Sequence, residues 1–391
     1  MNPMMQRFLA LLLICLFMVP SALGETVTEI SVAESGDTDS LFAEFDSIDL
    51  PSVTGAADTE VVPDSGNKTI TLTFTGDVTL GSEEAYRKRA SSFESYDKKH
   101  GDRYFLKNFL DLFENDDLTV INLEGVISDS AAGENKKKEF RFRGAPELLN
   151  ILKVSSVEAC NLSNNHMQDY GDRGYKSTME ELEKADIAYF GYANSYIFEK
   201  DGIRIAFYGL VSPKFNSLFP KCKEEIAQLK ADGVNAVVFV FHAGTEYGKG
   251  RNYLQERFGK AAIDAGADLV IMHHPHVLQG MEIYNKRTIC YSLGNFCFGG
   301  NSRVKKPDSL LTAVVQADLT FSARGEYLGQ QLRIYPAHIS GTYPESNFQP
   351  VRVTGAEADE VIARIQVDTK YTLNPYSEKD GCAVQDYLSA E

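Results

Sequence analysis

The feature that most constrains the fold is a long alternation of strand-like and helix-like segments that begins abruptly at residue 68. The strand-like segments are rich in β-branched and aromatic residues, and the helix-like segments between them carry apolar residues at helical spacing. Such alternation is typical of α/β proteins. The expected strands are 69–75, 118–123, 157–162, 187–191, 204–210, 235–241 and 268–272, and the expected helices are 104–113, 146–154, 174–185, 223–231 and 253–265.

After residue 272 the pattern becomes one of strands alone, expected at 277–284, 287–293, 311–320 and 328–337. An alternation followed by a run of strands predicts stacked sheets with helices outside them. We therefore expect an α/β domain over residues 68–345. A C-terminal extension, 346–391, is expected to pack one helix, near 356–365, on that domain.

The first 67 residues do not belong to this body. Residues 1–24 carry one cation, Arg7, then 12 apolar residues and a small-residue cleavage pattern, which is typical of a secretory signal peptide. An uncleaved N-terminal anchor has the same composition and stays an alternative. Residues 25–67 contain 11 Asp or Glu and no Lys or Arg, which predicts a disordered acidic linker. We expect an extracytoplasmic protein, secreted or tethered to the bacterial membrane.

The charge of the chain follows from this division. The linker contributes −11 of the formal net charge of −16, so the folded body is only mildly acidic. An acidic chain argues against a general nucleic-acid binder, which needs clustered Lys and Arg for phosphate contacts. Five cysteines follow the predicted signal peptide, so at least one thiol is expected to be unpaired.

Unusual polar residues follow one predicted strand after another. In open α/β sheets, ligands bind beyond the carboxyl ends of the strands, so these side chains are expected to share one cleft. Carboxylate, amide and imidazole groups form a mixed nitrogen and oxygen ligand set that suits one or two divalent ions of Mn, Zn or Fe. The residues concerned are Asp77, Glu124, Asn164, Asn165, His166, His242, His274, His276 and Asn295.

Six motifs in this order resemble those of the CapA family of capsule-synthesis proteins. The family is associated with poly-γ-glutamate production and has the calcineurin-like metallophosphoesterase fold. The resemblance covers residues 70–300 and implies two stacked mixed β-sheets flanked by helices, a four-layer αββα sandwich. The motifs are G-D-V-T-L-G (76–81), N-L-E (122–124), N-L-S-N-N-H-M-Q-D-Y-G (161–171), H-A-G-T-E-Y (242–247), H-H-P-H-V-L-Q (273–279) and Y-S-L-G-N-F (291–296).

The resemblance also implies roles. His166 would stabilise the transition state or protonate the leaving group. The implied metal ligands are Asp77, Glu124, Asn165, His242, His274 and His276. Two positions depart from the superfamily pattern: Thr79 stands where a His ligand is usual, and Glu124 where an Asp usually bridges the metals. Either departure could leave one tight metal, a different metal, or a pocket that binds without hydrolysing.

Further residues are candidates for supporting roles. Arg141 and Arg143 are candidate anion clamps for substrate, although a basic run is commonly a solvated face. Asn164 and Glu246 are expected to orient metal ligands, and Asn295 to line the cleft or cap a turn. His273 is expected to be structural.

These features lead to one hypothesis and two rivals. The first is an exported metal-dependent phosphoesterase-like hydrolase or transferase that acts on an anionic envelope polymer or its phosphorylated precursor. The second is a non-catalytic accessory subunit that binds the polymer beside membrane synthase subunits. The third is a structural envelope protein with inert histidines.

Overall fold

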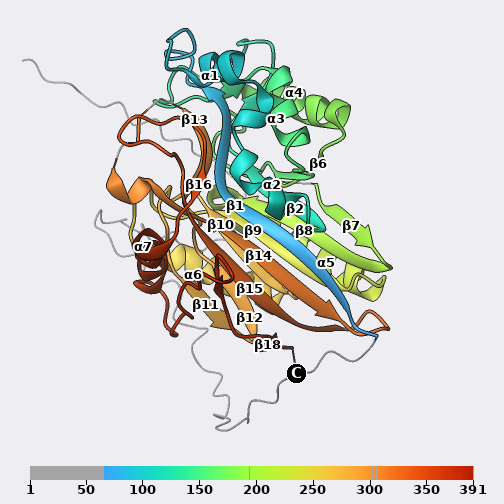
Figure 1. Ribbon diagram of the computed structural model, residues 1–391. Coiled ribbons are helices and arrows are strands. Elements are labelled where there is room, and N and C mark those ends of the chain that lie inside the picture. Colours follow the sequence, from blue (N-terminus) through green and yellow to red (C-terminus); the bar gives the residue numbers. More distant parts are fainter. Residues whose placement is uncertain (1–65, 193, 301–302, 305, 391) are drawn as a thin grey trace, which may run out of the picture. The chain divides into compact units, whose positions relative to one another are not determined.

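The computed structural model describes residues 66–192, 194–300, 303–304 and 306–390 (Figure 1). The predicted signal peptide, and the predicted linker apart from its last two residues, lie outside the described residues. Within the described part of the chain, no helix combines the length and apolar character that crossing a membrane requires.

Two mixed sheets form the centre of the structure. In the first, the order is β16-β15-β14-β1-β2-β5-β6, with β13 beside β1 and with β17 and β18 beside β15. Its strands are β1 (Lys68–Ser82), β2 (Leu118–Leu123), β5 (Ala159–Asn161), β6 (Ala188–Phe190), β13 (Asn295–Gly300), β14 (Leu311–Phe321), β15 (Tyr327–His338), β16 (Val351–Arg352), β17 (Ala383–Val384) and β18 (Leu388–Ser389).

The second sheet has the order β11-β12-β10-β9-β8-β7. Its strands are β7 (Tyr196–Lys200), β8 (Ile203–Val211), β9 (Ala236–His242), β10 (Leu269–His273), β11 (Met281–Tyr284) and β12 (Arg287–Cys290). The four inner strands, β8, β9, β10 and β12, run parallel, and the outer strands β7 and β11 are antiparallel to their neighbours. A separate short pair joins β3 (Val126–Ile127) to β4 (Arg143–Gly144).

Apolar side chains on the facing sides of the two sheets pack into one core, to which Val120 of the first sheet and Val238 of the second contribute. Helices cover the outer faces. The first sheet carries α1 (Phe93–His100), α2 (Leu110–Phe113), α3 (Leu149–Lys153) and α4 (Gly171–Ala185), and the second carries α5 (Phe215–Ala231) and α6 (Tyr253–Asp264). The predicted four-layer α/β sandwich is confirmed.

The sequence pattern and the structure differ at several elements. The expected helix 104–113 consists of two 3₁₀ turns, Asp102–Tyr104 and Lys107–Phe109, followed by the single turn α2. Its apolar side chains are buried as the pattern requires, since Phe105, Leu106 and Phe109 are fully covered. Sequence reasoning missed α1, β7 and β13. It also placed the start of α5 eight residues late, since this helix continues through Pro220.

The C-terminal extension contributes to the first sheet. Its helix α7 (Gly355–Gln366) lies within one residue of the predicted bounds at each end. Val361, Ile362 and Ile365 of α7 join the core between the sheets. Strands β16, β17 and β18 all pair with β15, so this segment completes the edge of the sheet.

Candidate metal centre

The carboxyl ends of strands from both sheets meet at one place. Asp77 of β1 lies opposite Asn122, near the end of β2, and Glu124 follows directly after β2. In the second sheet, His242 and His273 are the last residues of β9 and β10 and lie opposite each other. The backbone N–H of His274 lies 3.3 Å from Asp77 Oδ2, so the two sheets are joined at this point. The strand-end cluster expected from the sequence is therefore formed.

Glu124 occupies the middle of this cluster. Its side chain is fully buried, and neither carboxylate oxygen has a hydrogen-bond partner among the described residues. Its Oε1 lies 3.7 Å from His166 Nε2, 3.5 Å from His242 Nε2 and 3.8 Å from His276 Nε2. Burial, together with the nearby charge of Asp77, raises the pKa of Glu124 well above its usual value. A buried carboxylate without a partner is costly unless a cation balances it.

A second group of donors adjoins Glu124. The Nε2 atom of His242 lies 2.7 Å from Asn165 Oδ1 and 3.1 Å from His274 Nδ1. Burial lowers the pKa of His242 and of His274, and each imidazole also feels the positive charge of neighbouring histidines. Both side chains are therefore held neutral, which is the form in which imidazole binds a metal.

Asp77 and His276 form the other side of the centre. Burial opposes ionisation of Asp77, but the imidazoles of His273 and His276, 3.1 and 3.3 Å from its oxygens, outweigh that cost and hold its pKa well below the usual value. For His276, the cost of burial is outweighed by the charges of Glu124 and Asp77, which raise its pKa to about 10. Donor atoms of Asp77, Glu124 and His276 all lie within 4.8 Å of one another.

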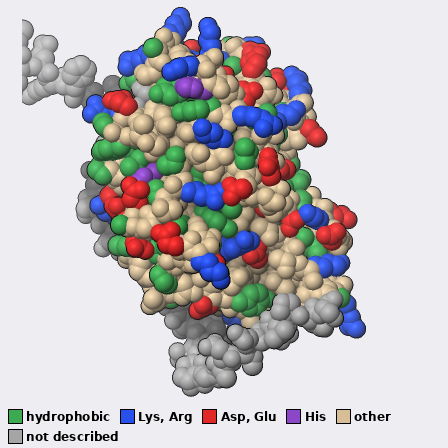
Figure 2. Space-filling model, in the orientation of Figure 1, with side chains coloured by type: hydrophobic (Ala, Val, Ile, Leu, Met, Phe, Trp, Pro, Cys, Tyr) green, Lys and Arg blue, Asp and Glu red, His purple; other side chains and the backbone are tan. Residues whose placement is uncertain are grey.

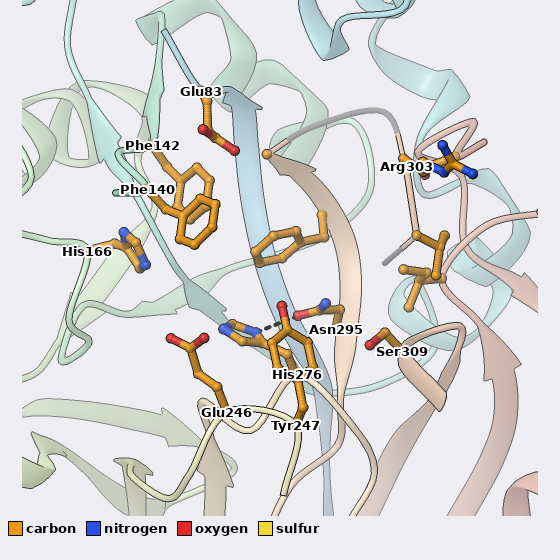
Figure 3. Close-up of a pocket in the computed structure, with 15 residues that line it drawn as sticks. Glu83, Phe140, Phe142, His166, Glu246, Tyr247, His276, Asn295, Arg303 and Ser309 are labelled. Carbon is orange, nitrogen blue, oxygen red and sulfur yellow. Dashed lines mark hydrogen bonds between the residues drawn. The ribbon is translucent and has the colours of Figure 1, made fainter. Parts of the chain in front are cut away.

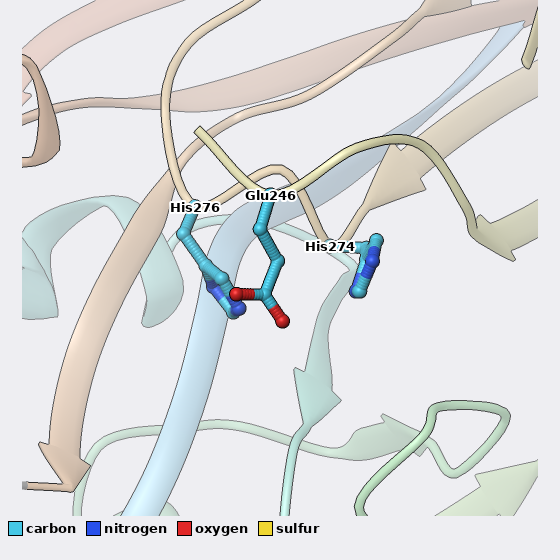
Figure 4. A group of neighbouring side chains, drawn as sticks. All are labelled: Glu246, His274 and His276. Carbon is cyan, nitrogen blue, oxygen red and sulfur yellow. The ribbon is translucent and has the colours of Figure 1, made fainter. Parts of the chain in front are cut away.

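These donors fit a divalent cation. Two adjoining groups, one around Asp77 and His276 and one around Asn165, His242 and His274, share Glu124 and supply only nitrogen and oxygen ligands. Such a set suits Zn, Mn or Fe. Glu246 extends it, because its carboxylate approaches His274 and His276 within the same limit (Figure 4). Among the described residues no thiolate joins this set, and their five cysteines are free, buried and elsewhere: Cys160, Cys222, Cys290, Cys297 and Cys382.

The turn that carries His274 and His276 is strained. Both residues have positive φ, 101° and 57°, which is uncommon for side chains with a Cβ. Backbone strain of this kind persists where the surrounding structure enforces it, and it clusters at functional sites. A hydrogen bond of 2.8 Å from the Tyr247 N–H to the carbonyl of Pro275, between the two histidines, helps to enforce it here. Across the site, the Oδ1 of Asn295 lies 2.8 Å from His276 Nδ1 and orients that ring.

His166 is held by a buried carboxylate that the sequence did not single out. Its Nδ1 lies 2.7 Å from Asp169 Oδ2, and Asp169 is fully buried. Asp169 also accepts a hydrogen bond of 2.8 Å from the Phe142 N–H and forms an ion pair with Lys138 at 2.5 Å. Burial lowers the pKa of His166, and the charge of Asp169 opposes this effect without reversing it.

A ladder of buried amides orients the ligands from behind. Asn122 Nδ2 donates to Asp77 Oδ1 at 2.8 Å and lies 3.3 Å from His242 Nδ1. Asn161 in turn donates to Asn122 Oδ1 at 2.8 Å. Neither Asn122 nor Asn161 was predicted as a site residue, although polar side chains inside otherwise apolar strands were a usable signal. His273, expected to be structural, is buried with its Nδ1 beside Asp77.

Asn164 and Thr79 support the ligands and do not belong to the donor groups. The Oδ1 of Asn164 accepts hydrogen bonds from the His166 and Met167 N–H groups, both at 3.1 Å. Thr79, which stands where a His ligand is usual in the superfamily, donates its hydroxyl to the backbone carbonyl of Glu124 at 3.0 Å. Thr79 therefore braces a ligand instead of supplying one.

The structure does not bring Arg141 and Arg143 to the centre. Arg141 pairs with Glu134 at 2.9 Å, and Arg143 pairs with Glu84 at 3.2 Å and donates to the Ser128 carbonyl at 2.7 Å. The reason is alternation: in an extended segment, successive side chains point to opposite sides. Since Phe142 faces the His166 ring, its two neighbours face away. No geometry supports their predicted role as anion clamps.

A cavity opens beside the donors (Figure 3). His166, Glu246, His276 and Asn295 line it on the side of the candidate metal centre. Its other walls are largely aromatic and aliphatic, with Glu83 and Arg303 among the charged lining residues. A substrate could therefore reach the candidate ligands from this space.

Comparison with solved structures finds distant likenesses. A putative 5'-nucleotidase from Staphylococcus aureus aligns with 79% of this chain and 61% of its own, at 11% identity and a TM-score of 0.37. The purple acid phosphatase PPD1 of yellow lupin aligns with 79% of this chain and 57% of its own, at 12% identity and a TM-score of 0.35.

Sequence relatives are more similar in sequence, at 25–28% identity. The PGA biosynthesis protein CapA of Bacillus subtilis is 27% identical over 342 residues, 81% of this chain and 83% of that protein. The capsule biosynthesis protein CapA of Bacillus anthracis is 28% identical over 257 residues, 59% of this chain and 60% of that protein. A probable polyglutamine synthesis accessory protein of Mycobacterium tuberculosis is 25% identical over 211 residues, 46% of this chain and 55% of that protein.

The family comparison covers the segment that builds the site. Residues 71–300 match the family described as bacterial capsule synthesis protein PGA_cap, and every candidate ligand discussed above lies between these limits. The chain belongs to this capsule synthesis family.

Proposed function

We propose that this protein is an exported, metal-dependent hydrolase of the phosphoesterase type that acts on an anionic envelope polymer or on its phosphorylated precursor. One observation carries the proposal: the Glu124 carboxylate is buried, has no hydrogen-bond partner among the described residues, and lies within 3.8 Å of three histidine nitrogens. Burial of a carboxylate without a hydrogen bond is costly, and a bound cation would offset this cost. The family of the chain supports the polymer context.

The two groups of donor atoms suggest which residues would hold each cation. Asp77, Glu124 and His276 would hold one divalent cation, and Glu124 would share a second with Asn165, His242 and His274. When bound, such cations polarise a phosphoryl oxygen and lower the pKa of water. The buried amide of Asn122 fixes Asp77 and faces His242, so the ligands are oriented before any cation binds.

His166 would then act on the leaving group. Asp169 holds the Nδ1 edge of the ring, so Nε2 is the atom that faces the centre, 3.7 Å from Glu124. Once Nε2 also carries a proton taken up from water, His166 can stabilise charge from that position or give this proton to the departing oxygen. The ring of Phe142, whose centroid lies 4.4 Å from that of His166, restricts its movement and access by water.

Replacement of His166 tests the catalytic part of the proposal. In the manganese-loaded protein, His166→Ala is expected to reduce phosphodiester cleavage by about 100-fold or more while the metal content stays unchanged. His100→Ala is the matched control, because His100 is exposed and stacks on Tyr104. Equal turnover in wild type and His166→Ala would contradict the assigned role.

A second candidate is a non-catalytic accessory subunit that binds the polymer beside membrane synthase subunits. Two observations favour it: a relative is described as a probable polyglutamine synthesis accessory protein, and Thr79 supplies no ligand. Metal-loaded protein that cleaves none of a panel of phosphoesters, yet binds poly-γ-glutamate, would select this candidate. Protein that binds no divalent metal would select the third, purely structural hypothesis.

Export is proposed from the N-terminal sequence alone. The single cation, apolar run and small residues of positions 1–24 support a signal peptide or an anchor, and the acidic stretch after it supports a spacer. Fractionation of cells that express the full chain, with N-terminal sequencing of the mature protein, tests this and separates cleavage from anchoring.

A further inference from the structure

The cavity beside the candidate metal centre has an aromatic wall, which we define as Phe140, Phe142 and Phe298. The ring centroids of Phe142 and Phe298 lie 5.6 Å apart in an edge-to-face arrangement. Figure 3 shows Phe140 and Phe142 projecting into the space that His166 also faces. Phe140 and Phe298 are half-buried, so part of each ring remains accessible from the cavity.

The aromatic wall is fixed to the same residues that build the metal centre. The Phe142 N–H donates to Asp169, which also holds His166. Phe298 lies on β13, three residues after Asn295, and its ring centroid is 5.5 Å from that of His276. The wall therefore keeps a set position relative to the atoms that would hold a phosphoryl group.

The charges around the wall do not single out a polyanion. Of the described residues that line the cavity, Glu83 and Glu246 are acidic, and Arg303 and His276 can carry positive charge, so the lining has no excess of positive charge. A chain of carboxylates beside the phenyl rings would lose hydration without gaining matched cations from the wall. A flat, uncharged ring would instead stack on the aromatic faces that line the cavity.

We infer that the group attached to the phosphoryl in the substrate carries an uncharged ring, which the aromatic wall binds while the phosphoryl lies at the metal centre. This inference rests on the proposed phosphoesterase function and narrows its substrate class to a ring-bearing phosphoester, of the sort found in phosphorylated precursors. Phe140 and Phe298 would then determine specificity, and the polycarboxylate chain would not occupy this cavity.

Phosphonates test the inference without any leaving-group chemistry. Titration calorimetry on the manganese-loaded full chain compares phenylphosphonate with methylphosphonate, which share the head group and differ in the ring. We expect the phenyl compound to bind about tenfold more tightly, or about 1.4 kcal/mol. Cyclohexylphosphonate distinguishes the two kinds of ring that a substrate could carry. If it binds as tightly as phenylphosphonate, the substrate ring is saturated, as in a sugar; if it binds more weakly, the ring is an aromatic base.

Variants locate the effect. Phe298→Ala and Phe140→Ala should each reduce the phenyl-to-methyl ratio at least threefold and leave methylphosphonate binding unchanged. Phe298→Leu is a control for misfolding, because it removes the aromatic ring and keeps apolar volume. Tyr253→Ala is a control for loss of an aromatic ring elsewhere, because Tyr253 is exposed and does not line the cavity. Equal affinities of the wild-type protein for the two phosphonates would overturn this inference and leave the proposed function standing. Failure of both to bind to metal-loaded protein would overturn the proposed function with it.

Discussion

Two buried carboxylates, one after strand β2 and one before strand β10, have different surroundings. Glu124, at the carboxyl end of β2, lies among imidazoles, and neither of its carboxylate oxygens has a hydrogen-bond partner in the described part of the chain. Near the amino end of β10, Asp268 receives an ion pair of 3.0 Å from each of Lys230 and Arg287 and a hydrogen bond from the Val237 N–H. The Asp268 carboxylate is satisfied by the protein itself, and the Glu124 carboxylate is the one at which we propose that a cation binds.

This contrast separates residues that stabilise the fold from residues that serve the site. Satisfied polar groups rigidify a structure, whereas unsatisfied ones cost stability and are kept where function needs them. The surface adds little to this distinction, since Figure 2 shows Lys and Arg interspersed with Asp and Glu on the face in view.

The largest effect should follow replacement of Glu124. Glu124→Gln removes the charge that both donor groups share, so metal content should fall and phosphoesterase activity should drop more than about 100-fold. The melting temperature of the metal-free protein should not fall, because the Glu124 carboxylate makes no hydrogen bond with any described residue that the substitution would break. Metal analysis and thermal melting in chelator check both parts. A large loss of stability without metal would show that Glu124 is structural.

Replacement of Asp169 should have an intermediate effect. Asp169→Asn weakens the contact that holds His166 Nδ1, and activity should fall by about 10- to 100-fold with metal content retained. The matched control is Asp172→Asn, on the same stretch, whose carboxylate contacts Gln168 instead. Steady-state kinetics with a phosphodiester checks the prediction, and equal losses in both variants would refute it.

The satisfied carboxylate should respond in the opposite way. Asp268→Asn leaves Lys230 and Arg287 without their shared carboxylate, so the free energy of unfolding should fall by about 1–3 kcal/mol. Metal binding should be unchanged, because Asp268 precedes β10 and the candidate ligands His274 and His276 follow it. Urea unfolding and metal titration measure the two quantities, and weaker metal binding in this variant would remove the contrast between the two carboxylates.

The smallest effect concerns pH. Burial raises the pKa of Glu158 from 4.5 to about 7. Between these values the unfolded chain releases a proton that the folded protein keeps, so this group makes the protein less stable as the pH rises from about 4.5 to about 7. Glu158→Gln should therefore gain stability relative to wild type at pH 8 and none at pH 4. Urea unfolding at both pH values measures this, and a constant difference would contradict it.

Much of the site could be predicted because its signals are local. Asp77, Glu124, Asn165, His242, His274 and His276 each follow or end a strand that its own apolar pattern identifies. The orienting groups were harder: Asn122 and Asp169 matter because of the side chains they face, and those come from other strands or from the next turn. Arg141 and Arg143 were misleading for the same reason: the sequence shows their charge, but the direction in which each side chain points depends on the surrounding structure.

By itself, the sequence determined the alternation of elements and the identity of the donor side chains, because hydrophobic period and residue chemistry are properties of neighbours along the chain. Only the tertiary structure decided that the Glu124 carboxylate has no hydrogen-bond partner among the described residues, that Thr79 bonds the Glu124 carbonyl, and that Phe140 and Phe298 face the cavity beside the histidines. Those facts depend on which strands lie side by side, and the packing of two sheets fixes that across 200 residues of chain.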